Sequence, residues 1–174
     1  MSRLPHDTPS SPFIDDGDEP DVGETLARDE VLVRSLVSGD LGRVVRIDER
    51  ILGCNRLAYY ERKFCEVLRE SGVRVSLVAE TDELVTGFVM ARVDYGEFGQ
   101  AEATATIDTI GVDPTASGAR IGQALVSQLL VNLGALRVET VRTEVRWQDL
   151  EILGFLCRCG FAPAQRLCFT MNVE

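Results

Sequence analysis

The sequence is short of histidine: among its 174 residues only His6 carries an imidazole. A Ser-His-Asp or Cys-His catalytic unit needs a histidine beside its nucleophile, and many zinc sites use histidine ligands. A histidine-dependent catalytic unit and a histidine-ligated metal site are therefore both excluded from residues 31–174, and we expect no metal cofactor.

Long apolar runs and basic clusters are also missing. No stretch approaches the roughly 18 consecutive apolar residues of a membrane span. The first 25 residues lack the apolar centre of a signal peptide. No basic stripe is present that would follow a nucleic acid backbone. We therefore expect a cytoplasmic protein that binds neither membranes nor nucleic acids.

Acidic residues are concentrated at the N-terminus. Residues 1–30 carry nine acids and two arginines, which leaves only −3 of the total net charge of −10 for residues 31–174. A segment so rich in Asp, Ser and Pro buries too little apolar surface to offset the entropy cost of ordering. We predict a disordered tail over residues 1–30, either a solvated leader or a docking segment, and a single domain over residues 31–174.

Five cysteines are present in a chain without a recognisable export signal, which favours reduced thiols. Cys157 and Cys159 are separated by a single residue, so they lack the paired spacing of a structural zinc site. We expect the thiols to be buried as small apolar side chains.

Hydrophobic periodicity predicts a mixed α/β fold, with hairpin strands first and β-α-β units after them. The predicted elements, in chain order, are strand 31–37, helices 41–51 and 57–71, strands 73–80, 84–94 and 104–112, helix 118–134, strand 136–145, helix 147–160 and strand 166–173.

The stretch IDTIGVDPTASGARIGQALVSQLL, residues 107–130, passes from a strand to a helix through a loop of small residues. A helix N-terminus presents unpaired N–H groups and a partial positive charge, so small side chains there let a phosphate approach closely. The Lys-Ser/Thr pair of a P-loop and the dinucleotide fingerprint are both absent. Spacing alone leaves two alternatives, an anion cradle or a tightly packed turn.

The wider order of motifs resembles the GCN5-related N-acetyltransferase (GNAT) family over about residues 31–173. The family's loop signature, Q/R-x-x-G-x-G/A, falls on residues 117–122, where Gly122 matches and Arg120 replaces the central glycine. Gly160-Phe161 matches the family's second landmark. The resemblance implies a mostly antiparallel central sheet flanked by helices, with a strand-loop-helix unit for a pyrophosphate.

The resemblance also implies a reaction: transfer of an acetyl group from acetyl-CoA to a primary amine of a peptide, protein or small molecule, by direct attack in a ternary complex. The pantetheine arm would add to the strand before the loop as an extra strand, and the N–H of Val112 would stabilise the oxyanion. The implied cofactor-binding residues are Ile110, Gly111, Val112, Ser117, Gly118, Ala119, Arg120, Ile121, Gly122, Gln123 and Asp149.

A carboxylate is needed to take the proton of the attacking amine, because an alkyl ammonium stays protonated at neutral pH. Asp108 is the predicted base, since strand alternation would place it on the same face as Ile110 and Val112. Glu102 and Glu144 are alternatives, and Asp108 could instead be a hydrogen-bonded structural residue.

Four positions depart from the family pattern, the first being Ser117, which replaces the signature's Gln or Arg. Leu156 occupies the place of the family's thiolate-protonating tyrosine. Either the thiolate leaves without an acid, or it is protonated by Cys157, Tyr59, Tyr60 or Tyr95. Asp149 replaces an asparagine and can cap the following helix. Arg120 could either bind a phosphate or obstruct it. The alternative function is therefore a non-catalytic acyl-CoA-binding or sensor module. The resemblance to the family also implies that the protein could form a homodimer.

Overall fold

A computed structural model describes residues 31–70, 75–95, 103–116, 120–165 and 169–172. The predicted tail, the predicted loop residues Ser117, Gly118 and Ala119, and the alternative base Glu102 lie outside the described residues. Among the helices of the described part, none has the length and apolarity needed to cross a membrane.

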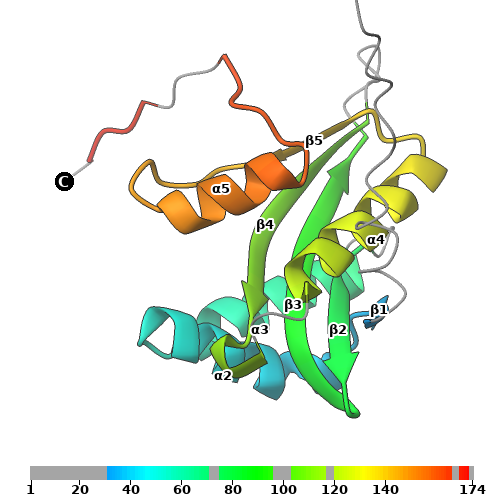
Figure 1. Ribbon diagram of the computed structural model, residues 1–174, viewed down its shortest axis with the longest axis vertical. Coiled ribbons are helices and arrows are strands. Elements are labelled where there is room, and N and C mark those ends of the chain that lie inside the picture. The colour runs from blue at the N-terminus through cyan, green and yellow to red at the C-terminus, as the bar shows by residue number, and fades with distance from the viewer. Residues whose placement is uncertain (1–30, 71–74, 96–102, 117–119, 166–168, 173–174) are drawn as a thin grey trace, which may run out of the picture.

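The described strands form one five-stranded sheet in the order β1-β2-β3-β4-β5 (Figure 1). The first four strands pair antiparallel, and only β4 and β5 run parallel. The strands are β1 Leu32–Ser35, β2 Leu77–Thr81, β3 Leu84–Asp94, β4 Thr104–Val112 and β5 Thr140–Thr143. The predicted mostly antiparallel α/β fold is confirmed.

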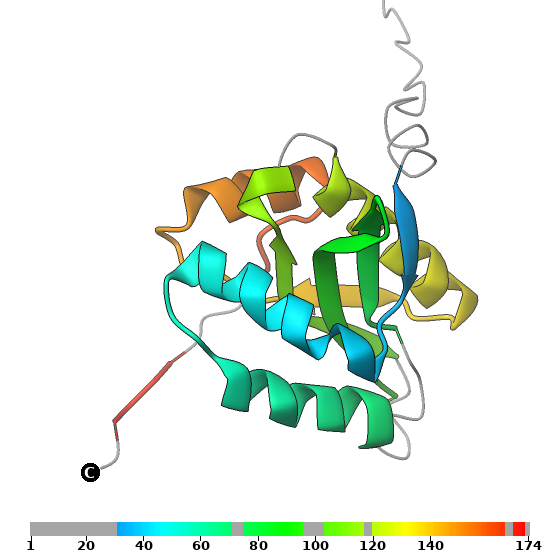
Figure 2. The same cartoon turned by 90° about the horizontal axis from the view of Figure 1, so that it is seen from below.

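Four helices cover the two faces of the sheet: α2 Leu41–Leu52, α3 Leu57–Cys65, α4 Ile121–Ala135 and α5 Leu150–Arg158. α2 and α3 lie on one face, where Val44, Ile47 and Phe64 share a core with Phe88 of β3. α4 lies on the other face and buries Leu125 and its neighbours, with α5 beside it (Figures 1 and 2). Helices α2, α3 and α4 bury residues at three- or four-residue spacing, which is the pattern that predicted them, whereas α5 buries Leu156 alone.

An irregularity interrupts the pairing of β3 with β4. Met90 lies opposite Thr109 and Ala91 lies opposite Ile107, so Asp108 is an extra residue in β4. Such a bulge moves the residues after it to the opposite face. Ile107 and Ile110 consequently both pack on the α4 side.

The predicted shared face of Asp108 with Ile110 and Val112 is therefore wrong. Ile110 and Val112 pack against the core under α4, whereas Asp108 contacts Lys63 of α3, on the opposite face. Strict alternation holds only in a regular strand, and no residue type in β4 marks the bulge.

The predicted last strand, 166–173, is also not borne out over its described residues, since 169–172 have no strand pairing. Phe169 and Met171 are 87% and 85% exposed. A strand requires a partner as well as an alternating pattern, and these residues lie away from the sheet in Figure 1. The helix predicted over 57–71 ends at Cys65 and continues as a wider π-helical turn, Glu66–Glu70.

Candidate functional site

The sheet forks between its two parallel strands. Thr104–Ile107 of β4 pair with Thr140–Thr143 of β5, and pairing stops there. The hydroxyl of Thr143 donates to the carbonyl of Ile107 at 3.1 Å and closes the last pair. From Asp108 to Val112, no described residue pairs with this edge of β4.

The open edge of β4 presents hydrogen-bonding groups to the fork. The N–H of Asp113 donates to the carbonyl of Thr86 at 2.8 Å, on the β3 side. Because successive N–H groups of a strand point to opposite edges, those of Val112 and Ile110 point into the fork. An extended ligand with its own donors and acceptors can bind there as an added strand.

A cleft of about 470 Å³ lies beside this edge, between β4, the start of α4 and one side of α5. It is lined by Ile110, Gly111, Val112, Ala116, Arg120, Ile121, Gly122, Gln123, Ile152, Phe155 and Arg158. Apart from Asp149, every predicted cofactor-binding residue that the structure describes lines this cleft. A larger cavity of about 670 Å³ next to α3 is lined by Glu61 and by no cation, so it does not suit a phosphate.

Gly122 allows α4 and α5 to approach each other. A β-carbon at this position would lie 3.0 Å from the ring of Phe155, tighter than ordinary contacts allow. The glycine therefore serves the packing of α4 against α5, whereas its predicted part in an anion cradle stays a prediction.

α5 supplies one wall of the cleft through Ile152, Phe155 and Arg158, spaced at helical intervals. The sequence reasoning missed these three residues. The available signal was a stripe of two apolar residues and one cation at three-residue spacing, which is indistinguishable from an ordinary packed helix face.

Arg120 is the residue that precedes α4, and its φ of 52° is left-handed. This conformation costs a residue with a β-carbon about 1 kcal/mol relative to glycine. Arg120 nevertheless lines the cleft together with Arg158, beside the N-terminal N–H groups of α4. Two guanidinium groups and a helix N-terminus make this end of the cleft suited to phosphate groups.

The loop before α4 is anchored by Asp113, which is 1% exposed. Its carboxylate accepts hydrogen bonds from the amide and hydroxyl of Thr115, at 3.1 and 2.8 Å. It also pairs with Arg43 and Arg50 of α2, at 3.2 and 2.6 Å. Burial alone would raise the pKa of Asp113, but the bonds from Thr115 and the two arginine charges hold it below its usual range.

The family model for the acetyltransferase (GNAT) family matches residues 44–161, which contain the fork, the cleft and the anchored loop. This chain belongs to the GNAT family.

Solved structures share the GNAT fold with this chain at low sequence identity. A transcriptional regulator from Bacillus halodurans C-125 has a TM-score of 0.70 at 22% identity, covering 82% of this chain and 99% of that one. The aminoglycoside N-acetyltransferase AAC(6')-Iy, in complex with CoA, has a TM-score of 0.69 at 12% identity, covering 82% and 94%. The aminoglycoside acetyltransferase meta-AAC0020, from an uncultured soil metagenomic sample, has a TM-score of 0.66 at 16% identity, covering 84% and 98%. No curated protein sequence matches the chain.

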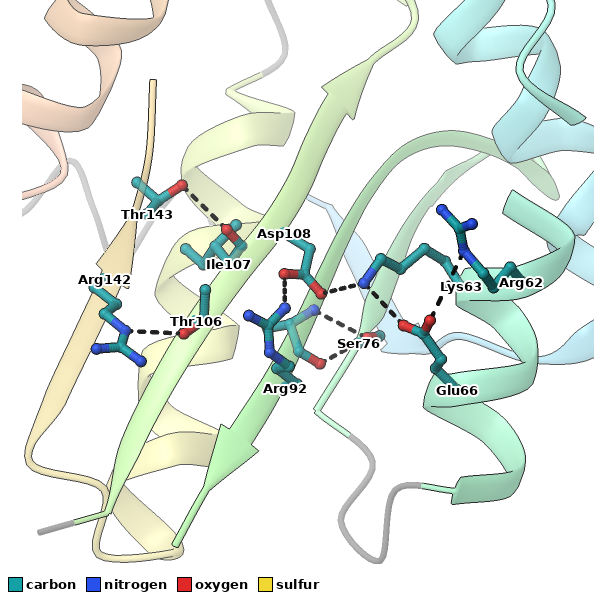
Figure 3. Close-up of polar contacts among 11 residues, drawn as sticks. Arg62, Lys63, Glu66, Ser76, Arg92, Thr106, Ile107, Asp108, Arg142 and Thr143 are labelled. Carbon is teal, nitrogen blue, oxygen red and sulfur yellow. Dashed lines mark hydrogen bonds and ion pairs between the residues drawn. The ribbon is translucent and has the colours of Figure 1, made fainter. Parts of the chain in front are cut away.

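In this GNAT domain, Asp108 lies at the point where the fork opens and is 11% exposed. Its carboxylate contacts the guanidinium of Arg92 on β3 and lies 3.4 Å from the ammonium of Lys63 on α3 (Figure 3). Lys63 also pairs with Glu66 at 2.8 Å. The hydrogen bond to Glu66, reinforced by Asp108, raises the pKa of Lys63 above its usual range. Asp108 is therefore held between two permanent cations.

None of the four suggested thiolate acids lines the cleft. The Tyr60 hydroxyl is buried and donates to Asp48 at 2.8 Å, and burial raises its pKa further. Tyr59 packs against Arg56, with 4.9 Å between the guanidinium carbon and the ring centre. Tyr95 and Cys157 are exposed outside the cleft. Leu156, at the usual tyrosine position, is buried.

Asp149 lies at the start of α5 as predicted, but its side chain makes no capping hydrogen bond. It pairs instead with Arg146 at 2.9 Å. Glu144, the alternative base, is exposed beyond the end of β5.

The expectation of buried thiols is wrong for Cys54 and Cys157, which are exposed. Cys65 and Cys159 are partly buried. Within the described part of the chain, no group of histidine, cysteine or acidic residues is arranged to hold a metal ion.

Proposed function

We propose that this GNAT protein transfers an acetyl group from acetyl-CoA to a primary amine by direct attack in a ternary complex. The observation that carries the proposal is the open edge of β4 beside the N-terminus of α4. The pyrophosphate is bound by the N–H groups of Ile121–Gln123, with Arg120 and Arg158 adding charge. The pantetheine arm lies along Ile110–Val112 as an added strand.

Acetyl-CoA supplies an activated acyl group: attack by the amine forms the C–N bond, breaks the C–S bond and releases CoA as a thiolate, which takes its proton from solvent. The N–H of Val112 stabilises the negative charge on the carbonyl oxygen. Asp108 accepts the proton of the amine. Lys63 and Arg92 assist this step because nearby positive charge disfavours the ammonium form of the acceptor.

The folded enzyme in this proposal is residues 31–174, and residues 1–30 are an accessory acidic tail. The acceptor is a peptide or a small molecule, and two copies could associate as a homodimer. The free thiols of Cys54, Cys65 and Cys157 agree with a reducing cytoplasm as the location.

A second candidate is an acyl-CoA-binding or sensor module without turnover. Two observations favour it: Leu156 replaces the expected acid, and Asp108 is occupied by Lys63 and Arg92. In that case the cleft would bind its ligand while the proton-transfer groups remain inactive.

Calorimetric titration with acetyl-CoA separates these proposals from a fold that has lost its cleft function. Micromolar binding is expected, with CoA and 3′-dephospho-CoA as comparators. A panel of amines then tests for turnover: CoA release with at least one amine supports the enzyme, and binding without release supports the module. Absence of acetyl-CoA binding would contradict both.

A further inference from the structure

Two arginines flank the fork on the face of the sheet that carries Asp108. Arg92 of β3 lies opposite Thr106 of β4, and Thr106 in turn lies opposite Arg142 of β5. Residues directly opposite one another in a sheet point to the same face. Figure 3 shows this row, with the small Thr106 between the two long cationic side chains.

The row is held in place by hydrogen bonds. The Nε of Arg142 donates to the hydroxyl of Thr106 at 3.1 Å, and the guanidinium of Arg92 contacts Asp108. Within the part of the chain that the structure describes, no carboxylate pairs with Arg142. Arg142 is exposed, and the Arg92 side chain is 51% exposed, so a ligand can reach both.

Charge on this face favours an anion. Arg62, Lys63, Arg92 and Arg142 lie on this side together with Asp108 and Glu66 (Figure 3). Asp94 follows Arg92 by two residues in β3 and adds a third carboxylate to the same face. Four cations therefore stand against three carboxylates. An acceptor with several ammonium groups would be repelled by this row, whereas a carboxylate would be attracted to it.

We infer that Arg92 and Arg142 bind a carboxylate of the acceptor, and that the substrate is a small amino acid-like amine. This inference rests on the proposed transfer to an amine at Asp108. Thr106 precedes Asp108 by two residues, and a strand advances about 3.3 Å per residue. A carboxylate above Thr106 therefore places an amine a few bonds away beside Asp108. Arg guanidinium groups suit a carboxylate because they can donate two parallel hydrogen bonds.

The experiment measures acetylation of glycine, β-alanine, γ-aminobutyrate and lysine, each compared with its own carboxamide, and of sisomicin as a polycationic amine. We expect kcat/KM for at least one carboxylate to exceed that of its carboxamide by about tenfold or more, since a hydrogen bond to a charged group contributes about 1.5–3 kcal/mol. Arg142→Gln should remove this preference by raising KM for the carboxylate, with KM for acetyl-CoA unchanged.

Arg46→Gln is the matched control, because Arg46 is an exposed arginine of α2. It should keep the preference for the carboxylate. Equal or faster acetylation of the carboxamides or sisomicin would overturn the inference, as would an equal loss for carboxylate and carboxamide in Arg142→Gln. Acetyl-CoA binding without acetylation of any carboxylate overturns the inference alone. Failure to bind acetyl-CoA overturns the proposed function as well.

Discussion

Gly122, Arg120 and Asp108 each combine a local structural role with a place at the fork. Gly122 admits the Phe155 ring, and Arg120 adopts a left-handed conformation that brings its charge to the cleft. Asp108 is the extra residue of a bulge. Residue type predicted that these positions matter, but the reason for each depends on a neighbour that is distant in sequence.

Replacing Gly122 with valine should weaken acetyl-CoA binding by more than tenfold, because the new side chain would displace Phe155 from the cleft wall. Calorimetric titration measures the affinity. Gly134→Val is the matched control: it lies in the same helix, and a β-carbon there meets nothing within 4 Å. Unchanged affinity in Gly122→Val would contradict the prediction.

Arg158→Gln should weaken acetyl-CoA binding by about tenfold, through loss of a charge-assisted bond to a phosphate. Titration with 3′-dephospho-CoA identifies which phosphate Arg158 contacts. If the parent and Arg158→Gln bind 3′-dephospho-CoA with equal affinity, the lost contact is to the 3′-phosphate. Arg137→Gln, at an exposed arginine after α4, should bind normally. If the parent, Arg158→Gln and Arg137→Gln bind acetyl-CoA with equal affinity, Arg158 does not take part in binding.

Asp108→Asn should lower the acetylation rate while acetyl-CoA affinity stays nearly intact, because the amide cannot take the proton of the amine. Single-turnover kinetics and titration measure the two quantities. Glu66→Gln also removes one partner of Lys63 but leaves Asp108 in place, so it should react close to normally. Equal rates for Asp108→Asn and the parent would dismiss Asp108 as the base.

At the level of elements, the loop that connects β4 to α4 is held in place by α2. Asp113 directly follows β4 and is paired with Arg43 and Arg50 of α2. Arg43 also donates to the carbonyl of Val85 at 2.7 Å. The sequence predicted a loop between β4 and α4. It could not indicate that the loop is tied to a helix about 60–70 residues earlier, because ion pairing across that separation leaves no local pattern.

Asp113→Asn should destabilise the fold by about 2 kcal/mol, since it removes the charge-assisted hydrogen bonds to Arg43 and Arg50, whose own side chains are partly exposed to solvent. The pKa of Asp113 is lowered in the folded state from 3.8, so its contribution is present above that value and is lost as the pH falls further. The free energy of unfolding of the variant should therefore fall less steeply below about pH 4. Urea unfolding at several pH values measures both effects.

Asp82→Asn is the control for this prediction, because Asp82 is exposed in the turn between β2 and β3. It should keep both the stability and the acid sensitivity of the parent. Asp40 also has a lowered pKa, through Arg34 and the amide of Val37, so Asp113→Asn should retain part of the acid response. A variant as stable as the parent at neutral pH would show that the Asp113 pairs contribute little.

For the molecule as a whole, the described cleft and fork are built from residues 104–158, which lie within the matched family region, 44–161. Most of the negative charge lies before this region. Most of the negative charge of the chain is therefore carried by residues that do not form the cleft or the fork.

Deleting residues 1–30 should leave acetyl-CoA affinity and the thermal unfolding midpoint within experimental error, since the described residues that line the cleft all fall within 110–158. Calorimetric titration and thermal unfolding of the shortened chain check this. A loss of affinity of tenfold or more would show that the acidic tail takes part in binding.

The sequence by itself determined the order of helices and strands, the family resemblance and the strand-loop-helix unit, because each depends on local periodicity and on small residues at a turn. Only the tertiary structure decided the bulge at Asp108, the approach of Phe155 to Gly122 and the row of Arg92 and Arg142 across three strands. It also left residues 169–172 unpaired despite their alternating pattern. Strand pairing and packing join residues far apart in the chain, so these features depend on which elements become neighbours.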